Sequence, residues 1–227
     1  MLFDLAPLLL GLLLLWFPRQ LMRLGAVVRR HRASSAPAKW KSEPWNTQEP
    51  GDPRLSFLLE FTKGRNYSDL LRAAAGSLVI VGGLGIQPAI SAASGSNRML
   101  MQQVLGVKLL ILLVAVLIQT MRIENRRLSF FAPVFFLAGL SVSLCGHWAA
   151  LFAFILVWAV NPMFKSAHGF LAGYGVLMAL FGYLFRDVDV RLILGAAVLC
   201  LVPVMLSLLT RRRLGVFTRK PTHVRTG

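Results

Sequence analysis

Carboxylates are scarce in this chain. Asp and Glu together number 9 among 227 residues, and none lies clearly within a long apolar run. Acid–base hydrolysis needs such a group beside the reacting bond, and proton-coupled transporters usually carry one inside the membrane. The sequence therefore argues against a carboxylate-based hydrolase and against a proton-coupled transporter of that type. It predicts no catalytic residue, and a non-enzymatic role is the favoured expectation.

Cysteine is rarer still. The 2 cysteines, Cys145 and Cys200, both lie in apolar stretches, which excludes a disulfide framework and predicts two buried, unreactive thiols. The stretch "SLCGHWAALF" places His147 two residues after Cys145, but a zinc site needs three or four ligands. The other histidines are expected on the opposite side of a membrane: His31, His168 and His223. No metal site and no cofactor are predicted.

Charged residues are also few, at 15% against about a quarter in soluble domains. Hydrophobic residues make up 56% of the chain, and the mean hydropathy is +0.64. A soluble protein of this size would have too little polar surface to cover it. The sequence predicts an all-α, polytopic integral membrane protein.

The charge that is present is mostly basic, with 25 Lys and Arg residues and a net charge of +16. Nucleic-acid binders carry such an excess on soluble modules, whereas here it flanks apolar runs, as in loops that face an anionic leaflet. The expected partner is a bilayer with an anionic inner leaflet, together with other membrane subunits and no nucleic acid. The expected lipid contacts are Arg29, Arg30, Arg32, Arg211, Arg212 and Arg213. The 19 arginines against 6 lysines and the short loops favour a bacterial cytoplasmic membrane.

The distribution of charge predicts about seven transmembrane helices, with the N-terminus outside and the C-terminus in the cytoplasm. In that topology the inner segments carry 10, 3, 1 and 6 Lys or Arg residues, and the outer loops carry only 3. The predicted parts are a transmembrane anchor with a basic flank (1–32), a cytoplasmic linker (33–68), a six-helix transmembrane bundle (69–210) and a basic cytoplasmic tail (211–227). A short amphipathic helix is expected within the linker, at about 53–63. An interfacial position for the N-terminal run is the alternative to a span.

Length arithmetic fixes the centre of the predicted topology. Only one ionisable side chain, His147, lies among the 37 residues between Arg127 and Lys165. One helix of that length would extend about 55 Å, against a hydrocarbon core of about 30 Å. Two spans are therefore expected, with a turn at Cys145–His147. The "RIENRR" segment before them is predicted to be a cytoplasmic loop.

Glycines gather on two of the predicted helices. The helix expected from Asp69, with a kink or an end at Gln87–Pro88, carries Gly76, Gly82, Gly83 and Gly85. A later helix carries Gly169, Gly173 and Gly182. Small residues let helices approach closely in a membrane. Both faces are interpreted as packing surfaces. The "GGLG" run lacks the lysine and the preceding strand of a phosphate-binding loop.

Few polar side chains fall inside the predicted spans, and Lys108 is the most informative of them. A charge near mid-bilayer costs a few kcal/mol and needs protein, water or an anion. Lys108 could extend towards the outer interface, pair with a carboxylate or carbonyl of another subunit, or bind an anionic substrate or lipid phosphate. Gln119 lies close to the same helical face. The predicted substrate or partner residues are Lys108, Gln119, Gln103 and Arg72.

Three functional hypotheses follow. The leading one is a non-catalytic subunit, scaffold or assembly factor of a cytoplasmic-membrane complex, because intramembrane carboxylates are lacking and small-residue faces are present. The second is a transporter, channel or lipid carrier that uses Lys108 for an anionic group. The third is a small membrane enzyme that acts on a lipid phosphate.

Overall fold

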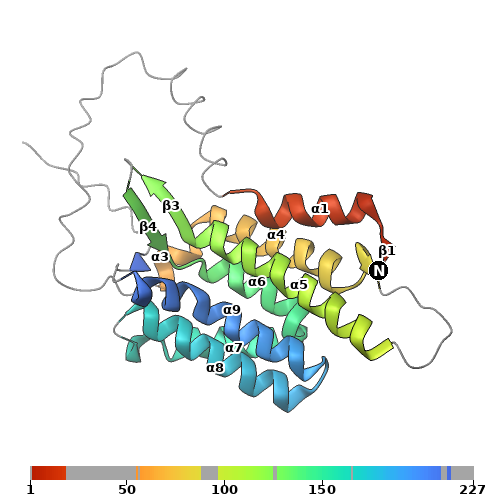
Figure 1. The fold of residues 1–227 in the computed structure, drawn as a ribbon. Coiled ribbons are helices and arrows are strands. Elements are labelled where there is room, and N and C mark those ends of the chain that lie inside the picture. Colours follow the sequence, from red (N-terminus) through yellow and green to blue (C-terminus); the bar gives the residue numbers. More distant parts are fainter. Residues whose placement is uncertain are drawn as a thin grey trace, which may run out of the picture.

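The chain folds into a bundle of α-helices with two small β-sheets (Figure 1). The structure is a computed structural model, and it describes residues 2–18, 55, 57–87, 97–124, 127–164, 166–210 and 214–215. Three of its helices are long and apolar enough to cross a membrane: α5 (Asn97–Thr120), α8 (Ala167–Phe185) and α9 (Val190–Leu209). The all-α class is confirmed, and these helices indicate a multi-pass membrane protein.

Three further apolar helices are shorter than a typical span. They are α1 (Leu5–Trp16), α6 (Val134–Cys145) and α7 (His147–Ala159), with 12, 12 and 13 residues. Such helices are about 18–20 Å long, less than the hydrocarbon core of about 30 Å. The described residues therefore contain three candidate spans of full length, against the seven expected from the whole sequence.

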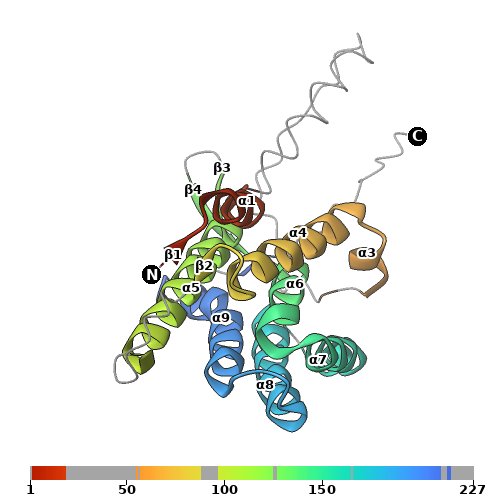
Figure 2. The ribbon, with the colours of Figure 1, turned by 90° about the vertical axis from the view of Figure 1, so that its right-hand side faces the viewer.

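Helix α6 occupies the centre of the bundle, and α4 (Gly64–Val81), α7, α8 and α9 pack around it (Figure 2). Ten of its 12 residues are buried. The closest approach is at Gly139, where an added Cβ would lie 2.3 Å from the carbonyl oxygen of Leu70 in α4. Glycine at this position therefore sets the distance between α4 and α6.

The predicted turn at Cys145–His147 is present. Gly146 ends α6 and begins α7 with φ of 85° and ψ of 154°, a conformation that side-chain-bearing residues rarely adopt. A Cβ there would also meet the Cβ of Asp187, in the connection between α8 and α9, at 3.2 Å. The two connections are thus packed against each other.

Helix α4 differs from its predicted bounds at both ends. It begins at Gly64, five residues before the expected start at Asp69, and it ends at Val81, short of Gln87. The residues after it form a short strand, β2 (Ile86–Gln87), which pairs with β1 (Leu2–Phe3) next to the N-terminus. The glycines after Val81 therefore belong to the segment between α4 and β2, and not to a packing face of the helix.

The sequence did not predict the second sheet. The "RIENRR" segment was expected to be a loop, but its first three residues belong to β3 (Met121–Glu124) and its last begins β4 (Arg127–Phe131). The two strands pair in antiparallel fashion. Strand β5 (Leu214–Gly215), within the expected tail, pairs in parallel with β4. Leu214 is only 1% exposed, so this part of the tail belongs to the core.

The expected amphipathic helix is present in part, as α3 (Phe57–Phe61), and Asp52 and Pro53 lie outside the described residues. The ring of Phe61 contacts Trp158 of α7 edge to face, with ring centroids 5.3 Å apart. The side-chain amide of Asn161, in the 3₁₀ turn η1 (Asn161–Met163), donates a hydrogen bond to the carbonyl oxygen of Leu55 at 2.7 Å. The segment before α4 is therefore docked on the bundle.

The connections between helices fall at two opposite ends of the bundle (Figure 1). At one end, β1 pairs with β2, and Gly146 contacts Asp187. At the other end, Leu55 is bonded to Asn161, and β5 pairs with β4. These are the same two groups of segments that the sequence assigned to opposite sides of a membrane.

Candidate functional site

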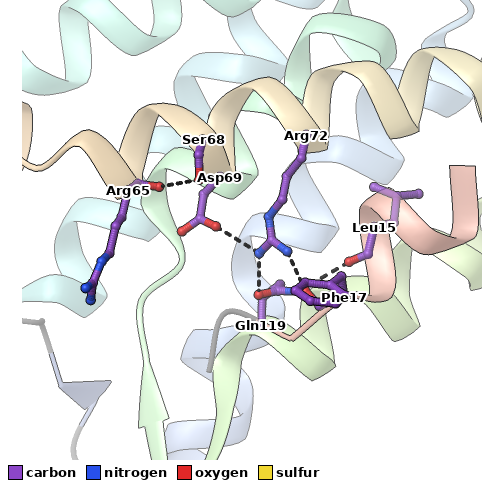
Figure 3. Close-up of polar contacts among 7 residues, drawn as sticks. All are labelled: Leu15, Phe17, Arg65, Ser68, Asp69, Arg72 and Gln119. Carbon is purple, nitrogen blue, oxygen red and sulfur yellow. Dashed lines mark hydrogen bonds and ion pairs between the residues drawn. The ribbon is translucent and has the colours of Figure 1, made fainter. Parts of the chain in front are cut away.

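A group of buried and half-buried polar side chains joins α1, α4 and α5. Asp69 and Arg72 lie one turn apart on α4, a spacing that places both side chains on one face. Their ion pair is 2.9 Å long, between Oδ1 of Asp69 and Nη2 of Arg72 (Figure 3). The two side chains are 3% and 7% exposed. A buried charge pair of this kind is compensated within a single helix.

Gln119, near the end of α5, connects this pair to α1. Its side-chain oxygen accepts a hydrogen bond from Nη2 of Arg72 at 2.8 Å, and its Nε2 donates to the carbonyl oxygens of Phe17 at 3.0 Å and Leu15 at 3.3 Å. Nη1 of Arg72 also donates to the carbonyl oxygen of Phe17. The last carbonyls of a helix lack partners within the helix and attract cations. The cluster therefore binds the C-terminal turn of α1 (Figure 3).

An aromatic ring covers the guanidinium. The Cζ atom of Arg72 lies 5.5 Å from the ring centroid of Phe136, on α6. A cation over a ring face is attracted by the quadrupole of the ring. Arg72 thus contacts side chains or carbonyls from α1, α4, α5 and α6. We call Asp69, Arg72, Gln119 and the carbonyl of Phe17 the polar junction.

The polar groups of the polar junction are bonded to one another. Arginine stays protonated in proteins, so it cannot serve as a general base. The charge of Asp69 balances that of Arg72 at 2.9 Å, and the amide of Gln119 is hydrogen-bonded at both its oxygen and its nitrogen. The cluster holds three helices in register.

Lys108 makes a second polar link between helices. Its Nζ donates a hydrogen bond to the carbonyl oxygen of Val81 at 3.0 Å, and the side chain is half-buried. Val81 is the last residue of α4, so the ammonium lies at the negative end of that helix. The sequence left three alternatives for Lys108: extension towards the outer interface, a carboxylate or carbonyl of another subunit, or an anionic group. The acceptor in the structure is a carbonyl of the same chain.

The four predicted substrate or partner residues fall into three groups. Arg72 and Gln119 are in direct contact in the polar junction. Lys108 is hydrogen-bonded to the last residue of α4, away from the polar junction. Gln103 is exposed on α5. The arginines expected to contact lipid lie outside the described residues: Arg29, Arg30, Arg32, Arg211, Arg212 and Arg213.

Several interhelical contacts were not predicted. The hydroxyls of Ser141 on α6 and Tyr174 on α8 are 3.0 Å apart, and Nε2 of His168 on α8 lies 2.8 Å from Oγ of Ser207 on α9. The Asp69–Arg72 pair was also missed, although a spacing of three residues is a known signal for a helical ion pair. The other contacts join distant segments and have no local signal.

The described residues contain no group of three or more His, Cys, Asp or Glu side chains that could hold a metal ion. Cys145 and Cys200 are buried free thiols. His147 is exposed, and its ring lies 5.1 Å from that of Trp148.

The chain was also compared with known proteins. No protein-family model, curated protein or solved structure matches it. The inference of function therefore depends on the geometry of the chain.

Proposed function

We propose that this chain is a non-catalytic integral membrane subunit, a scaffold or assembly factor of a cytoplasmic-membrane complex. One observation carries the proposal: the buried or half-buried cations on α4 and α5 bind acceptors within the chain. Arg72 is paired with Asp69 and Gln119, and Lys108 is bonded to the carbonyl of Val81. Both cations thus connect helices, which is the role expected in a structural subunit.

The proposed placement is a bilayer with the N-terminus outside. The segments grouped with β3, β4 and β5 carry most of the basic residues, as expected for the side that faces an anionic leaflet. The segments grouped with β1 and Gly146 contain only Arg98, Arg186 and Arg191. This asymmetry supports a cytoplasmic position for the sheet that contains β4.

The short length of the central helix α6 is compatible with a position inside the bilayer. Non-helical backbone is tolerated at membrane depth where protein covers it. The residues that precede α6 include Phe130 and Phe131, which are 1% and 4% exposed. Because protein covers this part of β4, the entry to α6 does not expose unsatisfied backbone groups to lipid.

The direct test is purification of the tagged full-length chain in mild detergent, followed by mass spectrometry of the eluate. A structural subunit is expected to elute with one or more membrane proteins at a fixed ratio, and the same proteins should be absent from a mock purification. Elution of the chain without any other protein would contradict the proposal.

A further inference from the structure

Arg186, the residue that follows α8, has an unusual backbone conformation for a residue with a side chain. Its φ is 52° and its ψ is 28°, in the left-handed region. Among the residues that the structure describes, every other residue with a positive φ is a glycine. Glycine is the usual residue in this conformation at a helix end, because a side chain there costs free energy. Such exceptions gather where a side chain is held for a ligand, so the guanidinium of Arg186 calls for an explanation.

The guanidinium of Arg186 is held against Tyr183, one turn earlier in the chain. Its Nη2 donates a hydrogen bond to the hydroxyl oxygen of Tyr183 at 2.9 Å, and its Cζ lies 4.7 Å from the centroid of the tyrosine ring. Both side chains are exposed. Because the tyrosine oxygen is the acceptor in this bond, its own hydrogen can donate to another group. The pair therefore offers N–H and O–H donors and one positive charge to a molecule outside the chain.

The two aspartates that follow Arg186 have other contacts. The Cβ of Asp187 lies 3.2 Å from the position of an added Cβ at Gly146, and Asp189 accepts a hydrogen bond from the backbone N–H of Arg191 at 2.8 Å. Within the described part of the chain, Arg186 forms no ion pair. Its charge is therefore available to an external anion.

The length of α8 places the pair at the depth of lipid phosphates. Helix α8 has 19 residues and is a candidate span, so it extends about 28 Å, close to the hydrocarbon thickness of about 30 Å. Arg186 comes directly after the helix and thus lies at the level of the headgroups, with Tyr183 one turn inside. Tyrosine and tryptophan are enriched at this level. Trp148, in the first turn of α7 beside the same connection, is 51% exposed.

An exposed apolar stripe on α8 leads up to this pair. Val176, Leu180 and Leu184 follow one another at intervals of four residues, and Tyr183 lies beside them on the same side of the helix. All four are more than half exposed. A phospholipid combines acyl chains, which cover such a stripe, with a phosphate at the level of Arg186. A free phosphate ion would use only the donors of the pair and would leave the stripe without a role in binding.

We propose that Tyr183 and Arg186 bind the phosphate of a phospholipid in the outer leaflet. The phosphate oxygens accept hydrogen bonds from the guanidinium and from the tyrosine hydroxyl, and the planar fork of arginine fits a phosphate well. This inference rests on the proposed membrane placement, but not on the proposed subunit role. Lipid binding by a chain that purifies without other proteins would support the site and contradict the subunit role. Co-purifying proteins without this lipid selectivity would do the reverse.

The test is lipid titration of the purified full-length chain in detergent, followed by native mass spectrometry. The probes are phosphatidylglycerol and a diacylglycerol with the same chains but no phosphate, and wild type should bind the first more tightly. Arg186→Gln should raise the dissociation constant for phosphatidylglycerol about fivefold, and Tyr183→Phe about two- to tenfold. Neither should change diacylglycerol binding. Arg191→Gln is the matched control, because it removes an exposed cation at the same end of the bundle and should have no effect.

Arg186→Gly separates lipid binding from folding. Glycine adopts the left-handed conformation without a steric cost, so the melting temperature in lipid-free detergent should equal or exceed that of wild type. The dissociation constant for phosphatidylglycerol should rise as it does in Arg186→Gln. A lower melting temperature would overturn the inference, because it would show that the guanidinium is held for stability. So would equal lipid affinities of wild type and Arg186→Gln, an equal effect of Arg191→Gln, or displacement of the lipid by an equal concentration of inorganic phosphate.

Discussion

Arg72 and Gln119 are 47 positions apart in sequence, yet the guanidinium of one donates a hydrogen bond to the side-chain oxygen of the other over 2.8 Å. Both also bind the carbonyl oxygen of Phe17. This contact brings α1, α4 and α5 together around one carbonyl at the end of α1. It also uses two of the four side chains that the sequence indicated as substrate or partner residues.

Removal of Arg72 should destabilise the protein strongly. Arg72→Met leaves Asp69 buried without its cation, and breaking a buried pair in this way costs about 3–5 kcal/mol in the free energy of unfolding. Chemical unfolding in detergent measures the loss. Arg65→Met is the control, since Arg65 is an exposed residue on the same helix and should change stability by less than about 0.5 kcal/mol.

The double variant Asp69→Asn/Arg72→Met separates the ion pair from the rest of the junction. Because it removes both charges, it should recover part of the stability lost in Arg72→Met. A double variant as unstable as the sum of the two single variants would show that the two side chains do not act as a pair.

Gly139→Ala should also be destabilising. The added methyl group would lie 2.3 Å from the carbonyl oxygen of Leu70, a backbone atom that cannot turn away, so α4 and α6 must separate. Overpacking of this kind costs about 1–3 kcal/mol. The melting temperature in detergent reports the effect, and Gly64→Ala, which meets no atom within 4 Å at the start of α4, should be neutral.

Gly146→Ala tests the turn between α6 and α7. Its backbone lies in a region that costs a residue with a side chain about 1–3 kcal/mol, and the new methyl group would also press on Asp187 at 3.2 Å. Gly83→Ala is the comparison, since Gly83 has the same φ of 85° but no atom within 4 Å. Gly146→Ala should lower the melting temperature more than Gly83→Ala. An effect of Gly146→Ala no larger than that of Gly83→Ala would contradict this prediction.

The hydroxyl pair between α6 and α8 predicts an asymmetry. Ser141 donates to the carbonyl oxygen of Ala138 at 2.7 Å, so the hydroxyl of Tyr174 is the donor in its 3.0 Å contact with Ser141. Ser141→Ala leaves the fully buried hydroxyl of Tyr174 without its hydrogen-bond acceptor. The free energy of unfolding should fall by about 1–3 kcal/mol. Tyr174→Phe leaves Ser141 bonded to Ala138 and should cost less. Unfolding measurements that rank the two variants in the opposite order would reverse this assignment of donor and acceptor.

Composition and local patterns were sufficient to predict part of the structure. Low charge and long apolar runs indicated the membrane class, and length arithmetic with a glycine placed the turn at Gly146. Gly76 and Gly182 also lie at close helix contacts, as their small size suggested.

The remaining features depend on distant partners. The pairing of β5 with β4 joins positions 84 residues apart, as the register of Phe130 with Leu214 shows, and no local pattern indicates it. Strand β2, after the end of α4, pairs with β1 near the N-terminus. Lys108 donates to the carbonyl oxygen of Val81, 27 positions away in sequence, so its acceptor was not predictable from the sequence around it.

The most direct test of the central claim is the Lys108→Met variant of the tagged full-length chain, compared with wild type for recovery of co-purifying membrane proteins and for complementation of a deletion strain. If the hydrogen bond of Lys108 holds α5 against the end of α4, less of the complex should be recovered with the variant than with wild type. Complementation should fall in parallel. Full recovery of the complex with loss of complementation would contradict the account, because it would assign Lys108 to a substrate.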